Sequence, residues 1–168
     1  NIELVSKLTK LGGNGPIMAN ALASFGLKVS YLGNLGYPNL HPVFADFANR
    51  AEVISIAEPG YTDAVEFEDG KVMLGKHQSL KQVNWNNIRE RYSLGQFAAK
   101  VAESQFVAFV NWTMLTGMTD IWAATLQEVC PGLTGPRRTL FFDLADPEKR
   151  TPAHMPAAPK LIAAFEMY

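Results

Sequence analysis

The stretch GGNGPIMANALASFGLKVSYLGNLG, residues 12–36, carries the clearest structural pattern of the chain. After the glycines, apolar side chains recur at the spacing of a helix that buries one face: Ile17, Met18, Ala21, Leu22 and Phe25. Pro16 suits the first helical position, and Gly26 suits the position just past the helix end. Residues 28–33 then have the composition of a strand. The stretch predicts a glycine-rich loop, a helix and a strand.

The chain beyond this stretch continues to alternate between strand and helix patterns. Strand patterns cover 52–57, 106–110 and 139–142, and helix patterns cover 40–51, 85–92, 96–103, 120–130 and the segment after Pro156. Asn84 and Thr119 are residue types that cap helix N-termini. Such alternation predicts an α/β fold in which helices flank a Rossmann-like, mostly parallel sheet.

One segment interrupts this alternation. Two short β-type runs, Tyr61 to Phe67 and Lys71 to Lys76, flank Glu68-Asp69-Gly70. Asp-Gly between β-type runs indicates a tight hairpin. We therefore expect a β-ribbon over 61–76, inserted into one α/β domain that spans 1–168. The open edges of such a ribbon predict a homodimer formed through it.

Composition excludes several classes of protein. The 168 residues are 48% hydrophobic and 18% charged, as in a folded globular domain, and the net charge of −1 favours neither nucleic acid nor a membrane surface. The single cysteine, Cys130, fits a reducing compartment. Without a long apolar run or a signal-peptide pattern, we expect a cytoplasmic protein. Because the chain begins at Asn1 and stops at Tyr168 inside a helical pattern, we expect a piece of a longer protein.

Residues 12–36 resemble the N-terminal signature of the ribokinase-like (PfkB) carbohydrate kinases. In that family a Gly-Gly-Asn loop precedes an alanine-rich helix and the stretch G-x-K-V-x-x-x-G-x-x-G. Residues 26–36, GLKVSYLGNLG, match that stretch in spacing and residue type. The resemblance extends over most of the chain. It implies the ribokinase-like fold, in which the ribbon 61–76 is part of a β-lid over the sugar.

The same resemblance implies ATP, Mg²⁺ and a sugar substrate for the full-length protein, because the family transfers a phosphoryl group from ATP to a sugar hydroxyl. Two departures stand out. Tyr37 occupies a position where the family usually has an acidic residue, and the family's C-terminal Gly-Ala-Gly-Asp loop, which supplies the catalytic base, does not occur in the sequence. We therefore expect no catalytic residue, and no kinase activity, in this chain by itself.

The candidate sugar-binding residues begin with the loop Gly12, Gly13 and Asn14. Glycines let the backbone approach a polyol closely, and an Asn side chain can both donate to and accept from a pair of hydroxyls. Taken alone, these residues are also typical of a tight turn with a helix cap. The downstream match favours the sugar loop. A dinucleotide fingerprint is disfavoured because Met18 stands where a glycine is required.

Three further candidates lie at or after predicted strand ends, where open α/β sheets bind ligands. Asn111 follows the strand 106–110, and either a substrate contact or a turn cap explains it. Asp143 follows the strand 139–142, where it would contact a sugar or metal, or cap the next turn. Together, Asp143 and the segment from Asp146 to Arg150 resemble the family's D-x-N-x-R region, with either aspartate as its first residue. Arg150 would bind a substrate phosphate or carboxylate, or pair with Asp146.

Other chemistry-bearing residues are assigned structural roles. The histidines lie far apart and share no metal-ligand spacing, and the tryptophans are expected in the core. Two rival functions remain: a non-catalytic sugar-binding module, or pseudoenzyme, on the same fold, and a protein that binds a nucleoside in place of a sugar.

Overall fold

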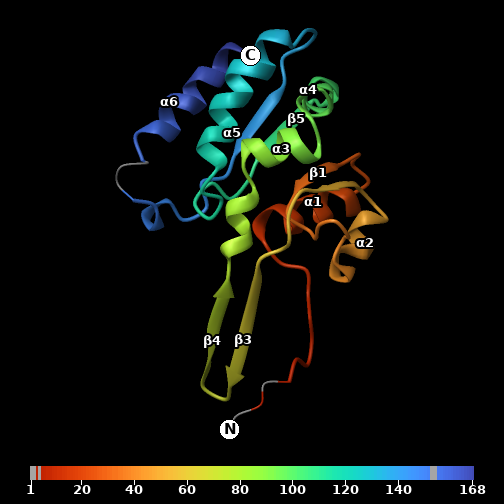
Figure 1. Cartoon of the computed structure of the whole chain (residues 1–168), viewed down its shortest axis with the longest axis vertical. Helices are drawn as coiled ribbons and strands as arrows, with labels where there is room; N and C mark the ends of the chain where they lie inside the picture. Colours follow the sequence, from red (N-terminus) through yellow and green to blue (C-terminus); the bar gives the residue numbers. More distant parts are fainter. Residues whose placement is uncertain (1–2, 4, 152–154) are drawn as a thin grey trace.

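The computed structural model describes residues 3, 5–151 and 155–168, and its elements follow the predicted alternation (Figure 1). The helices are α1 (Asn14–Ser24), α2 (Ala45–Ala48), α3 (Trp85–Arg91), α4 (Leu94–Glu103), α5 (Met118–Ala124) and α6 (Ala157–Ala164). The strands are β1 (Ser30–Gly33), β2 (Glu52–Ser55), β3 (Tyr61–Phe67), β4 (Gly70–Lys76), β5 (Phe106–Phe109) and β6 (Thr139–Phe142). In this described part, no helix has the length and apolar character needed to cross a membrane.

The six strands pair two by two. β1 pairs with β2 in parallel, with Ser30 opposite Glu52, and β5 pairs with β6 in parallel, with Phe106 opposite Thr139. β3 and β4 form the antiparallel ribbon. The predicted parallel pairing is therefore present within a mixed α/β fold. Across the described residues, however, the parallel strands form two separate pairs and not one continuous sheet.

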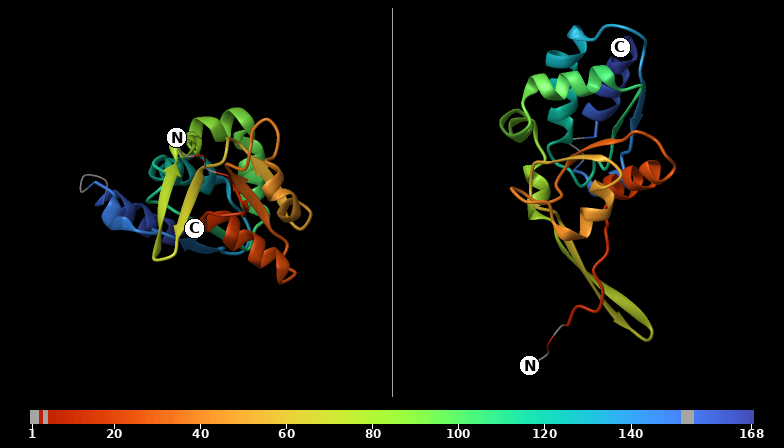
Figure 2. Two further views of the ribbon diagram at one scale, coloured as in Figure 1. Left: turned by 90° about the horizontal axis from the view of Figure 1, so that it is seen from below. Right: turned by 90° about the vertical axis from the view of Figure 1, so that its right-hand side faces the viewer.

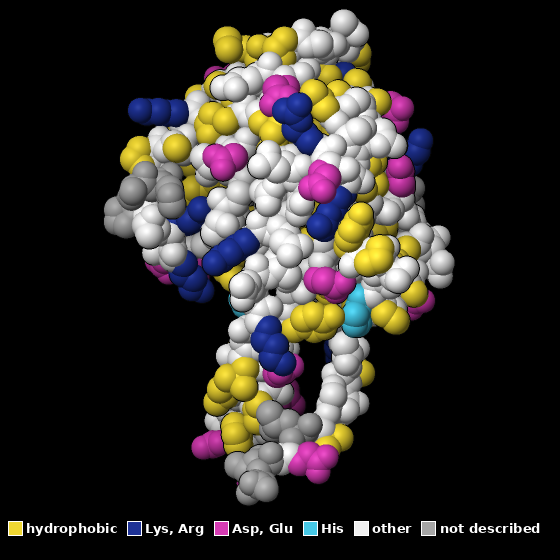
Figure 3. All heavy atoms as spheres, viewed as in Figure 1, with side chains coloured by type: hydrophobic (Ala, Val, Ile, Leu, Met, Phe, Trp, Pro, Cys, Tyr) yellow, Lys and Arg dark blue, Asp and Glu magenta, His cyan; other side chains and the backbone are white. Residues whose placement is uncertain are grey.

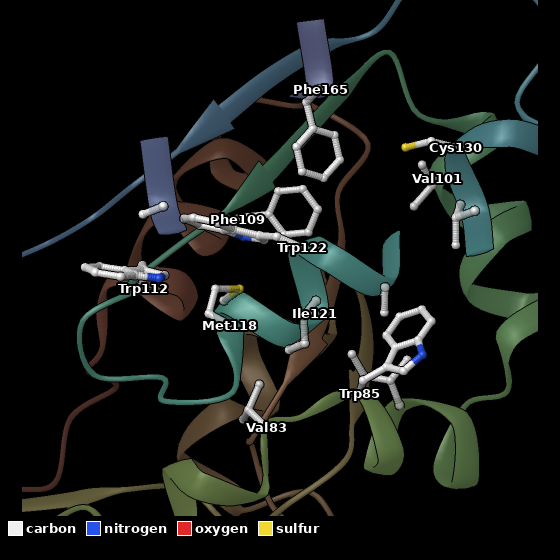
Figure 4. Close-up of a cluster of buried hydrophobic side chains, with 14 of the residues drawn as sticks. Val83, Trp85, Val101, Phe109, Trp112, Met118, Ile121, Trp122, Cys130 and Phe165 are labelled. Atoms are coloured by element: carbon white, nitrogen blue, oxygen red, sulfur yellow. The ribbon is translucent and has the colours of Figure 1, made fainter. Parts of the chain in front are cut away.

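Two hydrophobic clusters hold the body together. The smaller one has Ala19, Leu35, Phe44 and Phe47 at its centre and packs against one side of β1 and β2. The larger one gathers side chains from α3 to α6 around β5 and β6 (Figure 4). All three tryptophans are buried in this larger cluster, as predicted. The rings of Trp112 and Trp122 lie nearly parallel, with their centroids 6.3 Å apart.

Three predicted helix details are wrong. Pro16 is the third residue of α1, because Asn14 and Gly15 are already helical after Gly13, whose φ is 87°. The helix expected over 40–51 is a 3₁₀ turn (Pro42–Phe44) followed by the short α2. The helix expected over 120–130 begins at Met118 and passes into a π-helical turn at Thr125–Val129. Thr119 does not cap it, because Thr119 is the second residue of α5 and Gly117 is at the N-cap; the Thr119 hydroxyl accepts the indole N–H of Trp112 at 2.9 Å.

The hairpin β3–β4 confirms the predicted ribbon. It projects from the body on the side where the N-terminal segment leads to α1 (Figures 1 and 2). At its root, Thr62 Oγ1 lies 3.1 Å from Nε2 of His77, and Lys76 pairs with Asp63 at 2.6 Å. Hydrophobic side chains lie on the exposed surface of the hairpin (Figure 3). Almost all of its residues are exposed, so the ribbon depends on its own ladder and on these root contacts.

Candidate functional site

The glycine loop before α1 places an exposed polar side chain beside the end of a distant strand. Gly12 and Gly13 are exposed, and a Cβ atom added to Gly12 would meet no other atom within 4 Å. Asn14 opens α1, and its Nδ2 donates to Oδ2 of Asp143 at 3.3 Å. These residues are 129 positions apart in the chain. The fold thus brings together two of the sequence-predicted site residues.

The carboxylate of Asp143 is the centre of this group. It follows β6, and besides the Asn14 amide it accepts the backbone N–H of Asn111 on Oδ2 at 3.1 Å. Its Oδ1 accepts the backbone N–H of Ala145 at 2.7 Å. The carboxylate therefore performs the predicted turn cap and still reaches the glycine loop. Both roles that the sequence left open for Asp143 are compatible with this geometry.

Asn111 joins the group through its backbone. Its φ of 67° lies in the left-handed region, which Asn tolerates better than most residues. The half-buried side-chain amide of Asn111 has no hydrogen-bond partner among the described residues. The next N–H, that of Trp112, donates to the backbone carbonyl of Asp143 at 3.0 Å. The ends of β5 and β6 are therefore tied together at the point where Asn14 arrives.

Arg150 lies near this group but points elsewhere. Its guanidinium donates to the carbonyls of Trp112 and Leu115, and the side chain is buried. The predicted pairing partner, Asp146, instead binds Lys149 at 2.5 Å. Of the two aspartates that could begin the D-x-N-x-R region, Asp143 is the one that contacts Asn14. The substrate contact predicted for Arg150 stays a prediction.

Two contributors to the site were not predicted. Ala145, with φ of 57°, supplies an amide to Asp143, and an Asp that bonds the backbone two residues ahead is a known turn pattern that this sequence could have suggested. Thr113 donates its hydroxyl to the carbonyl of Leu144 at 2.6 Å. The local sequence does not predict the bond from Thr113 to Leu144, because that bond depends on β5 and β6 being neighbours.

A second polar group lies at the carboxyl ends of β1 and β2, around Tyr37. The Arg91 guanidinium carbon lies 4.1 Å from the centre of the Tyr37 ring, and Arg91 also donates to the carbonyl of Ile56. The Tyr37 N–H donates to Oε1 of Glu58 at 3.3 Å. The Glu58 carboxylate, from the segment after β2, therefore lies beside Tyr37, at the position where the sequence resemblance leads us to expect an acidic residue.

The buried ionisable groups differ from the exposed group of Asn14 and Asp143 in what they can offer a ligand. Burial lowers the pKa of the Arg150 guanidinium and raises the pKa of the Cys130 thiol. Within residues 3, 5–151 and 155–168, no three His, Cys, Asp or Glu side chains are placed to hold a metal ion. The Asn14 and Asp143 group, by contrast, offers amide and carboxylate atoms to a ligand, which suits a polyol better than a hydrophobic molecule.

Comparison with known proteins identifies the family. Residues 1–167 match the family model described as prokaryotic ketohexokinase. The chain belongs to this family. A protein of Haloferax volcanii named ketohexokinase is 30% identical to the chain over 164 residues. The aligned part is 98% of this chain and 44% of that protein, so the chain spans less than half the length of this curated ketohexokinase. No solved structure matches the chain.

Membership of the ketohexokinase family supports the sequence-based assignment to a family of sugar kinases. The comparison covers the glycine loop, both parallel strand pairs and the hairpin, because all of them lie within residues 1–167. The residue-level site assignments stay predictions.

Proposed function

We propose that the full-length protein transfers a phosphoryl group from ATP to a hydroxyl of a ketohexose, and that this chain contributes part of the sugar site and the lid. The observation that carries the proposal is the meeting of Asn14 and Asp143 on an exposed loop. A carboxylate accepts hydrogen bonds from hydroxyls, and an Asn amide both donates and accepts them, so together they can bind adjacent hydroxyls of a sugar. The bound sugar would exchange the 3.3 Å bond between them for its own.

The ribokinase-like, Rossmann-like arrangement belongs to the same proposal. In such folds ligands bind at the carboxyl ends of parallel strands, and Asn111 and Asp143 follow the ends of β5 and β6. Gly12 and Gly13 leave the approach to Asn14 open. ATP and Mg²⁺ would supply the phosphoryl group and neutralise its charge, and we assign no residue of this chain to either. The catalytic base also has no candidate here.

The test is phosphorylation of D-fructose by the full-length protein. ADP formation with ATP and Mg²⁺ is measured for the wild type, for Asn14→Ala and for Asn20→Ala. Asn20 is a matched control because it lies on the same helix and binds Arg50 at 2.7 Å, away from the loop. Asn14→Ala should raise KM for D-fructose by about tenfold or more, the equivalent of one or two hydrogen bonds, and Asn20→Ala should not.

The outcomes separate the rival functions. Absence of ADP formation, together with thermal stabilisation by D-fructose, would favour a sugar-binding module. Stabilisation by nucleosides and not by sugars would favour a nucleoside ligand. Equal KM values for the two Asn variants would refute the sugar loop.

We also propose that the lid hairpin mediates a homodimer. By strand register, one face of the hairpin carries Val65, Val72, Phe67 and Leu74, and the last three are 45–60% exposed. Beyond the ion pair of Asp63 and Lys76 near the root of the same face, these apolar side chains and the open ribbon edges are suited to pairing with a second copy. Val72→Glu should convert a dimer of the full-length protein to a monomer in light scattering, whereas Lys71→Glu, on the opposite face, should not. A mass unchanged by Val72→Glu would contradict the dimer.

A further inference from the structure

Arg150 is a buried cation whose hydrogen bonds go to the backbone of one turn. Its side chain is 9% exposed, and among the described residues no carboxylate forms an ion pair with it. One Nη atom donates to the carbonyl of Trp112 and, at 2.9 Å, to that of Leu115. The guanidinium carbon also lies 4.5 Å from the centre of the Trp112 ring. The cation is thus stabilised by carbonyl dipoles and an aromatic face.

The turn that Arg150 binds is the one that follows β5, and we call residues 111–115 the strand-end turn. Its first residue, Asn111, has left-handed backbone and donates its N–H to Asp143. Its middle is held by the bond from Thr113 Oγ1 to the carbonyl of Leu144. The Trp112 N–H adds a bond to the Asp143 carbonyl at 3.0 Å, and Arg150 is a further attachment, through the carbonyls of Trp112 and Leu115.

This arrangement uses the plane of the guanidinium as well as its charge. One Nη atom supplies both bonds to the carbonyls, which a lysine ammonium could also supply, but an ammonium has no planar face to lie over the Trp112 indole. Burying a cation without a carboxylate is costly, so the contacts to the turn must offset that cost. Burial lowers the pKa of the guanidinium, consistent with its desolvation.

We propose that Arg150 is a positioning residue: it fixes the strand-end turn so that Asn111 and Asp143 are held in place for the sugar, without touching the sugar itself. The inference rests on the proposed function, because it takes the Asn14 and Asp143 group as the sugar site. It differs from a direct substrate contact in one measurable respect. Loss of Arg150 should act through the mobility of residues 111–115.

The test compares full-length Arg150→Met, Arg150→Lys, Thr113→Val and the double variant Arg150→Met with Thr113→Val. Lys149→Met is the control, because Lys149 is the exposed neighbour that binds Asp146. We measure kcat/KM for D-fructose at a temperature where every variant is folded. Hydrogen exchange of the peptide that contains residues 111–115 is measured alongside by mass spectrometry.

Arg150→Met should lower kcat/KM on the order of 10- to 100-fold, since a misplaced positioning group can cost that much. Exchange in the strand-end turn should become faster. Arg150→Lys should restore only part of either readout, because an ammonium keeps the charge and loses the planar contact with Trp112. Thr113→Val is nearly isosteric and should change both readouts in the same direction. The double variant should lose less than the product of the two single losses, because both residues hold one turn. Lys149→Met should match the wild type.

Two results overturn the proposal. A kcat/KM for Arg150→Met within twofold of the wild type means that the turn does not depend on Arg150 for function. Reduced kcat/KM with unchanged exchange in residues 111–115 means that Arg150 acts directly on a ligand. A wild type inactive towards D-fructose would overturn the proposed function, and the positioning role then stands or falls on the exchange readout.

Discussion

Replacing Asp143 by Asn tests whether one carboxylate holds the candidate site together. Oδ2 accepts the Asn14 side chain at 3.3 Å and the Asn111 backbone at 3.1 Å, while Oδ1 accepts the Ala145 backbone at 2.7 Å. A carboxamide has one oxygen, so in either orientation at least one donor faces an NH₂ group. A hydrogen bond to a charged group contributes about 1.5–3 kcal/mol, and water can replace part of it at this half-buried position. We expect Asp143→Asn to lower the free energy of unfolding by about 1–3 kcal/mol.

The assay is urea unfolding of the full-length protein, followed by tryptophan fluorescence, with titration of D-fructose alongside. Asp146→Asn is the matched control, because it makes the same chemical change three residues away, where the carboxylate pairs with the exposed Lys149. The control should unfold at the wild-type urea concentration, since exposed ion pairs contribute little. If the two variants unfold at the same urea concentration and bind D-fructose equally, the carboxylate does not organise the site.

Further predictions concern packing, backbone and the buried thiol. Gly33→Ala places a Cβ 2.6 Å from the Tyr31 hydroxyl and should destabilise by about 1–3 kcal/mol in urea unfolding, whereas Gly12→Ala, which meets nothing, should not. Asn111→Gly keeps the left-handed backbone, so the free energy of unfolding should stay within about 1 kcal/mol of the wild type. It removes the side-chain amide, which has no partner among the described residues, so KM for D-fructose should rise. Burial raises the pKa of Cys130, so the unfolded thiol ionises first and stability should fall as pH rises above about 8.5. Alkylation of Cys130 at pH 9, followed by mass spectrometry, should be slower in folded than in urea-unfolded protein.

Local patterns predicted most of the elements, because those elements depend on neighbours in the sequence. The hairpin 61–76 follows from Asp69-Gly70 between β-type runs, and β6 was predicted to the residue. Asn84 caps α3 as expected, with its Oδ1 accepting the N–H of Asn87 at 3.0 Å. The errors fall where tertiary contacts override local preference. Thr119 is an example, since α5 begins one residue before it, at Met118, and its hydroxyl accepts the Trp112 indole N–H.

The candidate site could be predicted only in part, for a related physical reason. Asn14, Asn111 and Asp143 stand out because they follow a glycine loop or a strand end, which are features of the local sequence. That Asn14 and Asp143 touch depends on packing across 129 positions, which no periodicity encodes. The orientation of Arg150 toward the strand-end turn is equally a product of packing. The spacing of Asp146 and Arg150 predicted an ion pair between them, but Asp146 pairs with Lys149 instead.

The contact between Asn14 and Asp143 links α1 to the end of β6. α1 and one side of β1–β2 belong to the smaller hydrophobic cluster, whereas β5 and β6 belong to the larger one. This exposed bond at 3.3 Å contributes little to stability by itself. A sugar that exchanged this bond for several hydroxyl contacts would hold α1 against β6 with the free energy of its own binding. Under the proposed function, sugar binding would therefore also tie the exposed glycine loop to the end of β6.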